Sequence, residues 1–184
     1  ENGLGGLQLH LDGQDLYTQL IGEFNASNLT AVYAVARELG WNAMDALTHL
    51  SMLDAPAGRM QQVQAGKGDV HAIVDYAHTP DALSKVLQSL EDNYGKKISL
   101  VFGCGGDRDK KKRSLMAKVA NNYSNKIYIT DDNPRNEDPK KIRNYIEKRI
   151  DAHKCFNVGK REEAIKKAII NSDRDEVILI AGKG

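Results

Sequence analysis

The chain has 184 residues, of which 41% are hydrophobic and 28% charged, a composition typical of one globular domain or of one domain with part of a second. Its 26 basic and 25 acidic residues leave a net charge of +1, so we expect neither a nucleic acid nor an anionic membrane surface as a partner. No apolar run approaches the ~20 residues of a membrane helix, and the two cysteines fit a reducing, cytoplasmic setting better than a disulfide framework or a zinc site.

The first part of the chain, residues 1–57, predicts a hairpin followed by two helices. Alternating residues flank Asp12-Gly13, a pair typical of a tight hairpin turn. Helical periodicity predicts helices over residues 27–40 and 44–53, the first of them capped between Asn25 and Asn28. Alanine, proline and glycine then predict a linker that ends near residue 58.

The remaining residues, 58–184, alternate apolar runs with helical patterns. Two of the predicted helices begin with a capping residue followed by proline, at Thr79-Pro80 and Asp138-Pro139. Apolar strands separated by helices indicate a mostly parallel sheet that is covered on both faces. The pattern therefore predicts a doubly wound α/β domain, with strands over residues 71–76, 98–103, 126–130 and 176–182 and a short segment near 155–158.

Polar loops follow four of these predicted strands. In an open parallel sheet, ligands bind beyond the carboxyl ends of the strands, where such loops converge. The sequence therefore favours a ligand site at one sheet edge, formed by residues 75–80, 103–109, 131–135 and 181–184.

The loop GCGGDRD, residues 103–109, has glycines and charges but matches neither the P-loop pattern nor the GxGxxG fingerprint. Its glycines allow a close approach of the backbone to a ligand, and Arg108 can offer a two-armed fork to a carboxylate or phosphate. An exposed turn with salt-bridged charges explains the same residues equally well.

The DNPR sequence at residues 132–135 leaves the same two interpretations open, because Asp, Asn and Pro form turns for local reasons. Arg135 favours recognition of an anion. His78 fits a general base, a ligand contact or a helix-start histidine that bonds the backbone, and the last is favoured. Cys104 is expected to be a small buried side chain rather than a nucleophile. The residues alone thus indicate a ligand-binding α/β domain with two arginines directed at an acidic group.

The order of six motifs along the whole chain resembles the Mur ligases. The resemblance implies a Rossmann-like C-terminal Mur ligase domain at residues 58–184, truncated at its C-terminus. It also implies that residues 1–57 are the α+β tail of the central ATP-binding domain, without the P-loop. The motifs are GEFNASN (22–28), GRM (58–60), VDYAHTPD (74–81), VFGCGGDRDKKKR (101–113), TDDNPR (130–135) and LIAGKG (179–184).

The resemblance implies an ATP-dependent amide ligase that adds meso-diaminopimelate to UDP-MurNAc-L-Ala-D-Glu through an acyl phosphate, in cytoplasmic peptidoglycan synthesis. ATP and Mg²⁺ are the implied cofactors, and the family binds them mainly through parts that precede Glu1. We therefore expect a fragment that contains no catalytic or metal-binding residue, has no turnover by itself and is monomeric. A lysine-adding Mur ligase, a folylpolyglutamate synthetase and a non-catalytic amino-acid-binding module remain as alternatives.

The resemblance also implies residues that face the nucleotide. Asn25 and Asn28 match asparagines near the nucleotide, with Asn28 beside the adenine. Arg59 matches an arginine directed at the ATP phosphates. Asp75 matches the acid that holds the ribose hydroxyls, and His78 lies beside it in the same loop.

A second group matches the family's amino-acid pocket. Arg108 matches an arginine that binds a carboxylate of the incoming amino acid. In meso-diaminopimelate, the distal carboxylate can pair with Arg135 and the distal ammonium can meet the preceding polar residues. Lysine would leave that guanidinium unpaired, at a cost of ~1–3 kcal/mol for a buried polar group. The implied amino-acid-binding residues are Arg108, Asp132, Asn133, Pro134, Arg135 and Gly182.

Overall fold

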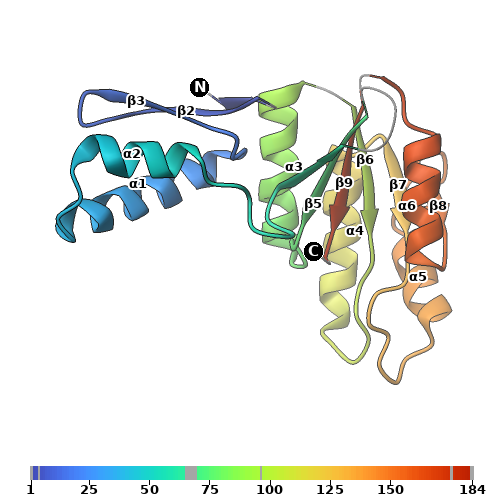
Figure 1. Cartoon of the computed structure of the whole chain (residues 1–184). Coiled ribbons are helices and arrows are strands. Elements are labelled where there is room, and N and C mark those ends of the chain that lie inside the picture. The colour runs from blue at the N-terminus through green and yellow to red at the C-terminus, as the bar shows by residue number, and fades with distance from the viewer. Residues whose placement is uncertain (1, 4, 65–69, 96, 175, 183–184) are drawn as a thin grey trace. The chain divides into compact units, whose positions relative to one another are not determined.

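The computed structural model describes residues 2–3, 5–64, 70–95, 97–174 and 176–182 (Figure 1). The chain separates into two compact units, Glu1–Pro56 (unit 1) and Ala57–Gly184 (unit 2). Among the helices of the described part, none combines the length and the apolar composition that crossing a membrane requires.

Unit 1 consists of a small antiparallel sheet and two helices. The strands β1 (Asn2–Gly3), β2 (Gly6–Leu11) and β3 (Gln14–Thr18) pair in chain order. The predicted hairpin between β2 and β3 is confirmed. Its turn residues have positive φ, 48° at Asp12 and 78° at Gly13, as a tight turn of the primed type requires.

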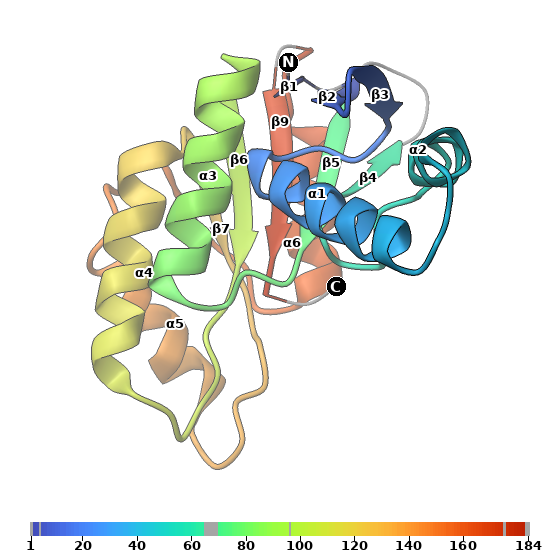
Figure 2. The same cartoon turned by 90° about the vertical axis from the view of Figure 1, so that its left-hand side faces the viewer.

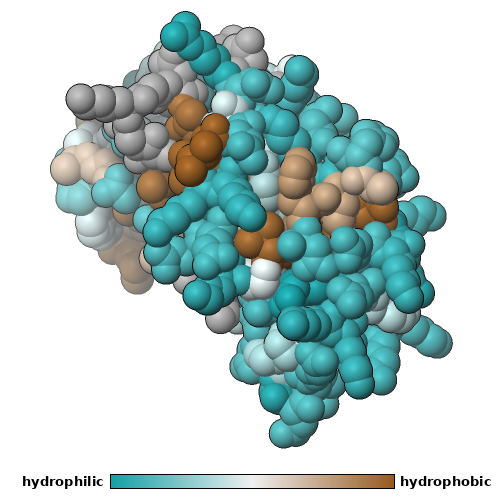
Figure 3. Space-filling view, turned by 90° about the vertical axis from the view of Figure 1, so that its right-hand side faces the viewer, coloured by the Kyte–Doolittle hydropathy of each residue, from teal (hydrophilic) through white to brown (hydrophobic). Residues whose placement is uncertain are grey.

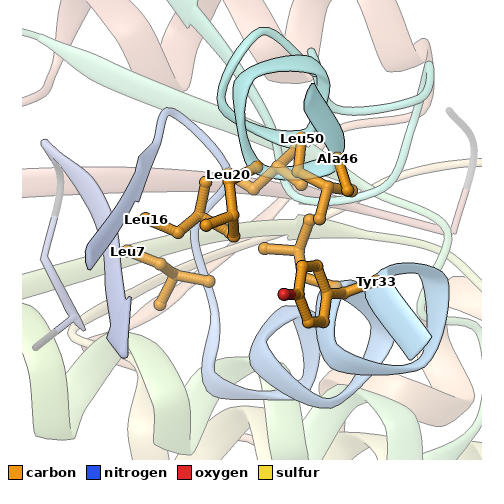
Figure 4. Packing of buried hydrophobic residues seen from close by; sticks show 8 residues of the cluster. Leu7, Leu16, Leu20, Tyr33, Ala46 and Leu50 are labelled. Atoms are coloured by element: carbon orange, nitrogen blue, oxygen red, sulfur yellow. The ribbon is translucent and has the colours of Figure 1, made fainter. Parts of the chain in front are cut away.

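The helices α1 (Glu23–Glu38) and α2 (Ala43–Ser51) complete unit 1. One face of the hairpin packs against both helices around a leucine-rich core (Figure 4). The hydroxyl of Tyr33 donates to Asp12 Oδ2 at 2.8 Å and so ties α1 to the hairpin turn. The buried members of this core are Leu7, Leu16, Leu20, Leu29, Tyr33, Ala46, Leu47 and Leu50.

The predicted start of α1 was wrong. The helix begins at Glu23, and the residue before it, Gly22, has a φ of 91° and no side chain with which to cap. Because this glycine turns the chain directly into the helix, Asn25 lies inside the first turn, where its Nδ2 donates to the carbonyl of Ile21 at 2.7 Å. A side-chain cap is instead found on α2, where Asn42 Oδ1 accepts from the amide of Asp45 at 2.8 Å.

Unit 2 is built on a six-stranded sheet with the order β4-β5-β9-β6-β7-β8 (Figures 1 and 2). All neighbouring pairs are parallel except β4 and β5, which are antiparallel. The central strand β9 is buried along its whole length, as its apolar sequence EVILIA predicts. The strands are β4 (Gln61–Gln64), β5 (His71–Asp75), β6 (Lys97–Phe102), β7 (Lys126–Ile129), β8 (Cys155–Asn157) and β9 (Glu176–Ala181).

Helices cover both faces of this sheet, which confirms the predicted doubly wound α/β class. Figure 2 shows α3 and α4 on one face and α6 on the other. The molecular surface over α5 and α6 is mostly hydrophilic (Figure 3). The helices are α3 (Pro80–Tyr94), α4 (Lys110–Tyr123), α5 (Pro139–Glu147) and α6 (Arg161–Ile170).

The two predicted caps of unit 2 are confirmed. Thr79 Oγ1 accepts from the amide of Ala82 at 3.2 Å, and Asp138 Oδ1 accepts from that of Lys140 at 2.9 Å. The strand β4 was not predicted, because its sequence QQVQ has almost no apolar side chains and it joins the sheet edge by backbone pairing.

Candidate functional site

The carboxyl ends of β5, β9, β6 and β7 bring the loops after β5, β6 and β7, and Gly182 after β9, to one edge of the sheet in unit 2; residues 183–184 of the fourth predicted loop lie outside the described residues. The loop after β6, residues 103–109, is called the glycine loop below, and the loop after β7, residues 131–138, is called the DNPR loop. Figures 1 and 2 show these two loops side by side. The ends of β5 and β9 are also joined, because the amide of Gly182 donates to the carbonyl of Asp75 at 3.0 Å.

Asp75, expected to face a ribose, is buried and already holds two backbone amides. Its Oδ2 accepts from the amide of Met60 at 2.9 Å, and its Oδ1 accepts from that of Ala77 at 2.8 Å. A carboxylate has about four acceptor positions, so further hydrogen bonds are possible. In this structure, Asp75 links two segments of backbone. One is the turn that contains Arg59, and the other is the start of the loop after β5.

Arg59 and His78 both contact the aromatic ring of Tyr76. The guanidinium of Arg59 lies 4.6 Å from the ring centroid of Tyr76, and the His78 ring meets the same residue edge-on at 4.8 Å. His78 Nδ1 contacts the carbonyl of Tyr76 at 2.9 Å, which requires a proton on that nitrogen. This is the backbone contact that the favoured interpretation of His78 expected. Tyr76, nearly half exposed, was not singled out in the sequence.

The glycines of the glycine loop leave room beside the backbone, and residues 130–135 pack into that room. A Cβ atom on Gly106 would lie 1.8 Å from the carbonyl oxygen of Pro134, and one on Gly103 would lie 2.5 Å from that of Thr130. On Gly105 it would lie 3.0 Å from Arg135 Nη1. The close approach that the glycines permit is therefore that of the neighbouring loop, and the sequence had suggested a ligand in this place.

Hydrogen bonds join the two loops along their length. The amide of Gly106 donates to the carbonyl of Asn133 at 2.8 Å, and Arg135 Nη1 donates to the carbonyl of Gly106 at 2.7 Å. Asn136 donates to Asp107 Oδ2 through its amide at 3.1 Å and its side chain at 2.9 Å. The two loops thus form one interlocked structure.

The two candidate arginines belong to these bonded loops, and both are exposed. Arg135 has a φ of 49° and uses one arm of its guanidinium for the carbonyl of Gly106, which leaves its other N–H groups for a ligand. Within the described part of the chain, no hydrogen bond or ion pair occupies Arg108. The structure therefore brings the two loops together, and an acidic ligand is a chemically suitable partner for both side chains.

Asp132 and Gly182 also meet at this edge. A Cβ atom on Gly182 would lie 3.9 Å from both Asp132 Oδ2 and the carbonyl oxygen of Ala77, so this glycine stands between two of the loops. Arg161 donates to the carbonyl of Ala181, the residue before Gly182, at 3.0 Å. Burial lowers the pKa of Arg161, and the nearby charge of Asp132 opposes that effect.

Sequence reasoning missed the buried charges beneath the loops. Arg113 is only 4% exposed although it directly follows six consecutive charged residues, 107–112. The signal was present, since Arg113 shares the helical face of the buried Met116, Ala117 and Ala120. A second pair, Arg143 with Asp131, links α5 to the start of the DNPR loop.

Cys104 is buried, as predicted. Burial raises the pKa of its thiol to about 12, so the thiol is protonated at neutral pH and is a poor nucleophile. Within the described ranges, no group of three or more His, Cys, Asp or Glu side chains could hold a metal ion.

In unit 1, the two asparagines expected near a nucleotide contact each other on α1. Asn28 Nδ2 donates to Asn25 Oδ1 at 3.2 Å, and Asn25 also holds the carbonyl of Ile21. Both asparagines belong to unit 1, whereas the loops of the sheet edge belong to unit 2.

The chain is similar to known ligases. Residues 58–184 match the family model described as Mur ligase, glutamate ligase domain. A Cytophaga hutchinsonii protein named UDP-N-acetylmuramoyl-L-alanyl-D-glutamate--2,6-diaminopimelate ligase is 45% identical over 183 residues, which are 97% of this chain and 37% of that protein. A Bacteroides thetaiotaomicron protein of the same name is 45% identical over 100% of this chain and 39% of its own length.

Solved structures agree with this result. A structure titled as UDP-N-acetylmuramoyl-L-alanyl-D-glutamate--2,6-diaminopimelate ligase matches 100% of this chain and 39% of its own, with a TM-score of 0.72 at 35% identity. Thermotoga maritima folylpolyglutamate synthase matches 92% of this chain and 38% of its own, with a TM-score of 0.74 at 19% identity, which shows a shared fold alone. The chain spans less than two fifths of the length of the curated relatives named above, and it belongs to the Mur ligase family.

Proposed function

We propose that the protein containing this chain is an ATP-dependent amide ligase that adds meso-diaminopimelate to UDP-MurNAc-L-Ala-D-Glu in cytoplasmic peptidoglycan synthesis, and that it acts as a monomer. The single observation that supports this most is the pairing of the glycine loop with the DNPR loop, since each carries one exposed arginine. The names of relatives 45% identical over nearly the whole chain support the same reaction.

Unit 2 would bind the incoming amino acid at this edge. Arg108 would bind one carboxylate of the amino acid. The free N–H groups of Arg135 would pair with the distal carboxylate, and Asp132 and Asn133 would meet the distal ammonium. Pro134 and Gly182 would leave room for the amino acid between these polar side chains, since neither residue carries a long side chain. An anchored guanidinium loses less conformational entropy on binding than a free one, which favours the carboxylate contact.

This arrangement would select against lysine. Lysine carries an ammonium group where meso-diaminopimelate carries a complete amino acid head, so Arg135 would have no carboxylate partner and would face a second cation. A polar group that the bound amino acid would bury without a partner costs ~1–3 kcal/mol, more when charged, which corresponds to roughly tenfold or more in specificity.

In unit 2, Asp75 and His78 would contact the ribose of a bound nucleotide, and Arg59 would contact its phosphates. In unit 1, Asn25 and Asn28 are the residues that we expect near a nucleotide base. ATP and Mg²⁺, when bound, would supply the phosphoryl group that activates the D-glutamate carboxyl. Because the chain spans less than two fifths of the length of its curated relatives, we expect most of this binding to come from parts of the ligase outside this chain, and the chain alone to be inactive.

Unit 1 would be the last part of a larger central domain. Its helix α1 exposes Val32, Val35 and Leu39 at 52%, 59% and 75%. These side chains lie three and four residues apart, so they form one apolar stripe on the helix. Large exposed apolar patches are rare on complete globular domains, and the remainder of a central domain would cover this one.

The test compares kcat/KM for meso-diaminopimelate and L-lysine in the full-length ligase and in its Arg135→Ala variant. We expect the unaltered enzyme to prefer meso-diaminopimelate by about tenfold or more, and the variant to lose most of that preference. Arg149→Ala is the matched control, because Arg149 is also an exposed arginine but contacts Tyr145 and Ser114, away from these loops. Equal kcat/KM for the two amino acids in the unaltered enzyme would contradict the proposal, and a preference for lysine would indicate a lysine-adding ligase.

A further inference from the structure

A buried ion pair lies beneath the two interlocked loops. Arg113, on α4, has a side chain that is only 5% exposed, and Glu137, in the DNPR loop, is 23% exposed. Arg113 Nη1 donates to Glu137 Oε2 at 2.9 Å, and its Nη2 donates to Oε1 at 2.6 Å. A buried guanidinium without such a two-armed partner is unfavourable, so replacing either residue alone leaves an unpaired group beneath the loops.

Each member of this pair also holds the backbone of the glycine loop. Glu137 Oε1 accepts from the amide of Asp107 at 2.7 Å, and Arg113 Nη2 donates to the carbonyl of Gly105 at 3.1 Å. These two contacts lie on either side of Gly106, which is the glycine that Pro134 packs against. The ion pair therefore fixes the part of the glycine loop that the DNPR loop contacts.

The carboxylate of Glu137 is connected to both candidate arginines through short stretches of chain, because it accepts from the amide of Asp107. Asp107 directly precedes Arg108, and Glu137 follows Arg135 by two residues. The amide of Glu137 donates to the carbonyl of Pro134 at 3.0 Å, which closes the turn that carries Arg135. The guanidinium of Arg113 and the amide of Asp107 lower the pKa of Glu137 to about 2, so its charge is present throughout the neutral pH range.

We propose that Glu137, acting through Arg113 and the amide of Asp107, is a positioning residue that sets the separation of Arg108 and Arg135 and thereby the affinity for the incoming amino acid. Glu137 itself touches no substrate. The proposal rests on the function proposed above, because it takes these two arginines as the groups that grip the amino acid.

The test is Glu137→Gln in the full-length ligase. Glutamine keeps the shape of the side chain and one acceptor for Asp107, but it removes the charge that Arg113 requires. Small displacements of substrate-holding groups can cost up to about a hundredfold. We expect the KM for meso-diaminopimelate to rise by about tenfold or more, while the KM for ATP changes by less than about twofold.

Glu176→Gln is the matched control. Glu176 is fully buried, and its carboxylate accepts from Ser99 Oγ at 2.6 Å, from Lys126 Nζ at 2.9 Å and from the amide of Asp173 at 3.0 Å. It thus has the same kinds of partners as Glu137, but it begins β9 and so lies at the opposite edge of the sheet. We expect this variant to lower the melting temperature and to leave the KM for meso-diaminopimelate unchanged.

Two outcomes would overturn the proposal: an unchanged KM for meso-diaminopimelate in Glu137→Gln, or an equal rise in Glu176→Gln. Glu137→Asp keeps the charge with a shorter reach, and we expect an intermediate KM. If the glutamine variant does not fold, this aspartate variant carries the test, and an unaltered KM in it overturns the proposal.

Hydrogen exchange separates this proposal from the function on which it rests. In the same full-length protein, the amides of residues 105–108, 133, 135 and 136 should exchange faster in Glu137→Gln than in Glu176→Gln, whichever amino acid the ligase uses. If the unaltered enzyme does not turn over meso-diaminopimelate, the proposed function fails, and the exchange rates still decide whether Glu137 holds the two loops. Equal exchange in both variants would overturn the proposal.

Discussion

At the scale of single residues, the carboxylate of Glu137 links protonation to stability. Arg113 lowers its pKa most strongly, the amide of Asp107 adds to that effect, and partial burial opposes both. In the unfolded chain the pKa of a glutamate is about 4.3. A folded pKa of about 2 therefore means that the unfolded state binds more protons between these two values, so stability rises with pH across that interval.

This linkage predicts how the effect of Glu137→Gln depends on pH. The loss of unfolding free energy in the variant should be fully present above a pH of about 4.3. It should shrink as the pH falls toward about 2, because the unaltered side chain then also loses its charge. Denaturant unfolding at a series of pH values measures the difference. Glu91→Gln, at an exposed position on α3, should show no such trend, and a difference that stays constant down to pH 3 would contradict the prediction.

At the scale of elements, the fit between the two loops depends on missing side chains. The space next to Gly106 is occupied by the carbonyl of Pro134, so a methyl group there must displace one loop from the other. A backbone carbonyl cannot turn aside as a flexible side chain can. Position 106 therefore requires glycine because of packing, since its φ is not positive.

Gly106→Ala should accordingly destabilise unit 2 by roughly 1–3 kcal/mol, the usual cost of overpacking. It should also raise the KM for the amino acid in the full-length ligase. Urea unfolding and steady-state kinetics measure the two effects. Gly5→Ala is the control, since a Cβ atom there would meet no atom within 4 Å. Unchanged stability in Gly106→Ala would mean that the loops separate easily.

The sequence predicted the elements that depend on local chemistry. Asp12-Gly13 formed the expected hairpin turn and Thr79-Pro80 the expected helix start, because each is determined by neighbouring residues. β4 was missed, since it is held by backbone pairing at an edge. The strand pattern also indicated the sheet edge at which the four loops meet.

The contacts within the candidate site could not be predicted in the same way. The contact of Gly106 with Pro134 joins residues far apart in the sequence, so only the folded chain reveals it. Arg113 follows a run of charged residues in the sequence, and its partner Glu137 lies 24 residues away on another loop. The ligand roles of the residues named from the resemblance stay predictions until binding is measured.

At the scale of the whole molecule, the two compact units differ in how completely each covers its apolar side chains. Unit 2 contains all six strands of its sheet and helices on both faces. Unit 1 buries a small leucine-rich core but leaves Trp41, Met44 and Met52 at 44%, 59% and 75% exposure, in addition to the stripe on α1. Small units with little buried surface are marginally stable.

We therefore expect residues 57–184 expressed alone to unfold cooperatively, and residues 1–56 alone to lack a cooperative transition and to bind a hydrophobic dye. Circular dichroism during denaturation and dye fluorescence measure these outcomes on each piece. The first piece serves as the control for the second, since both come from the same chain. A cooperative, monomeric unfolding transition of residues 1–56 would contradict the prediction.

The interlock of the two loops also limits how the building block of such a ligase can be exchanged by engineering. A transplanted DNPR loop with a different backbone path would collide with the host's glycine loop or leave a void beside it, because the two loops have complementary shapes. A donor segment for altered amino acid choice must therefore bring residues 103–109 and 131–138 together, along with the arginine on α4 beneath them.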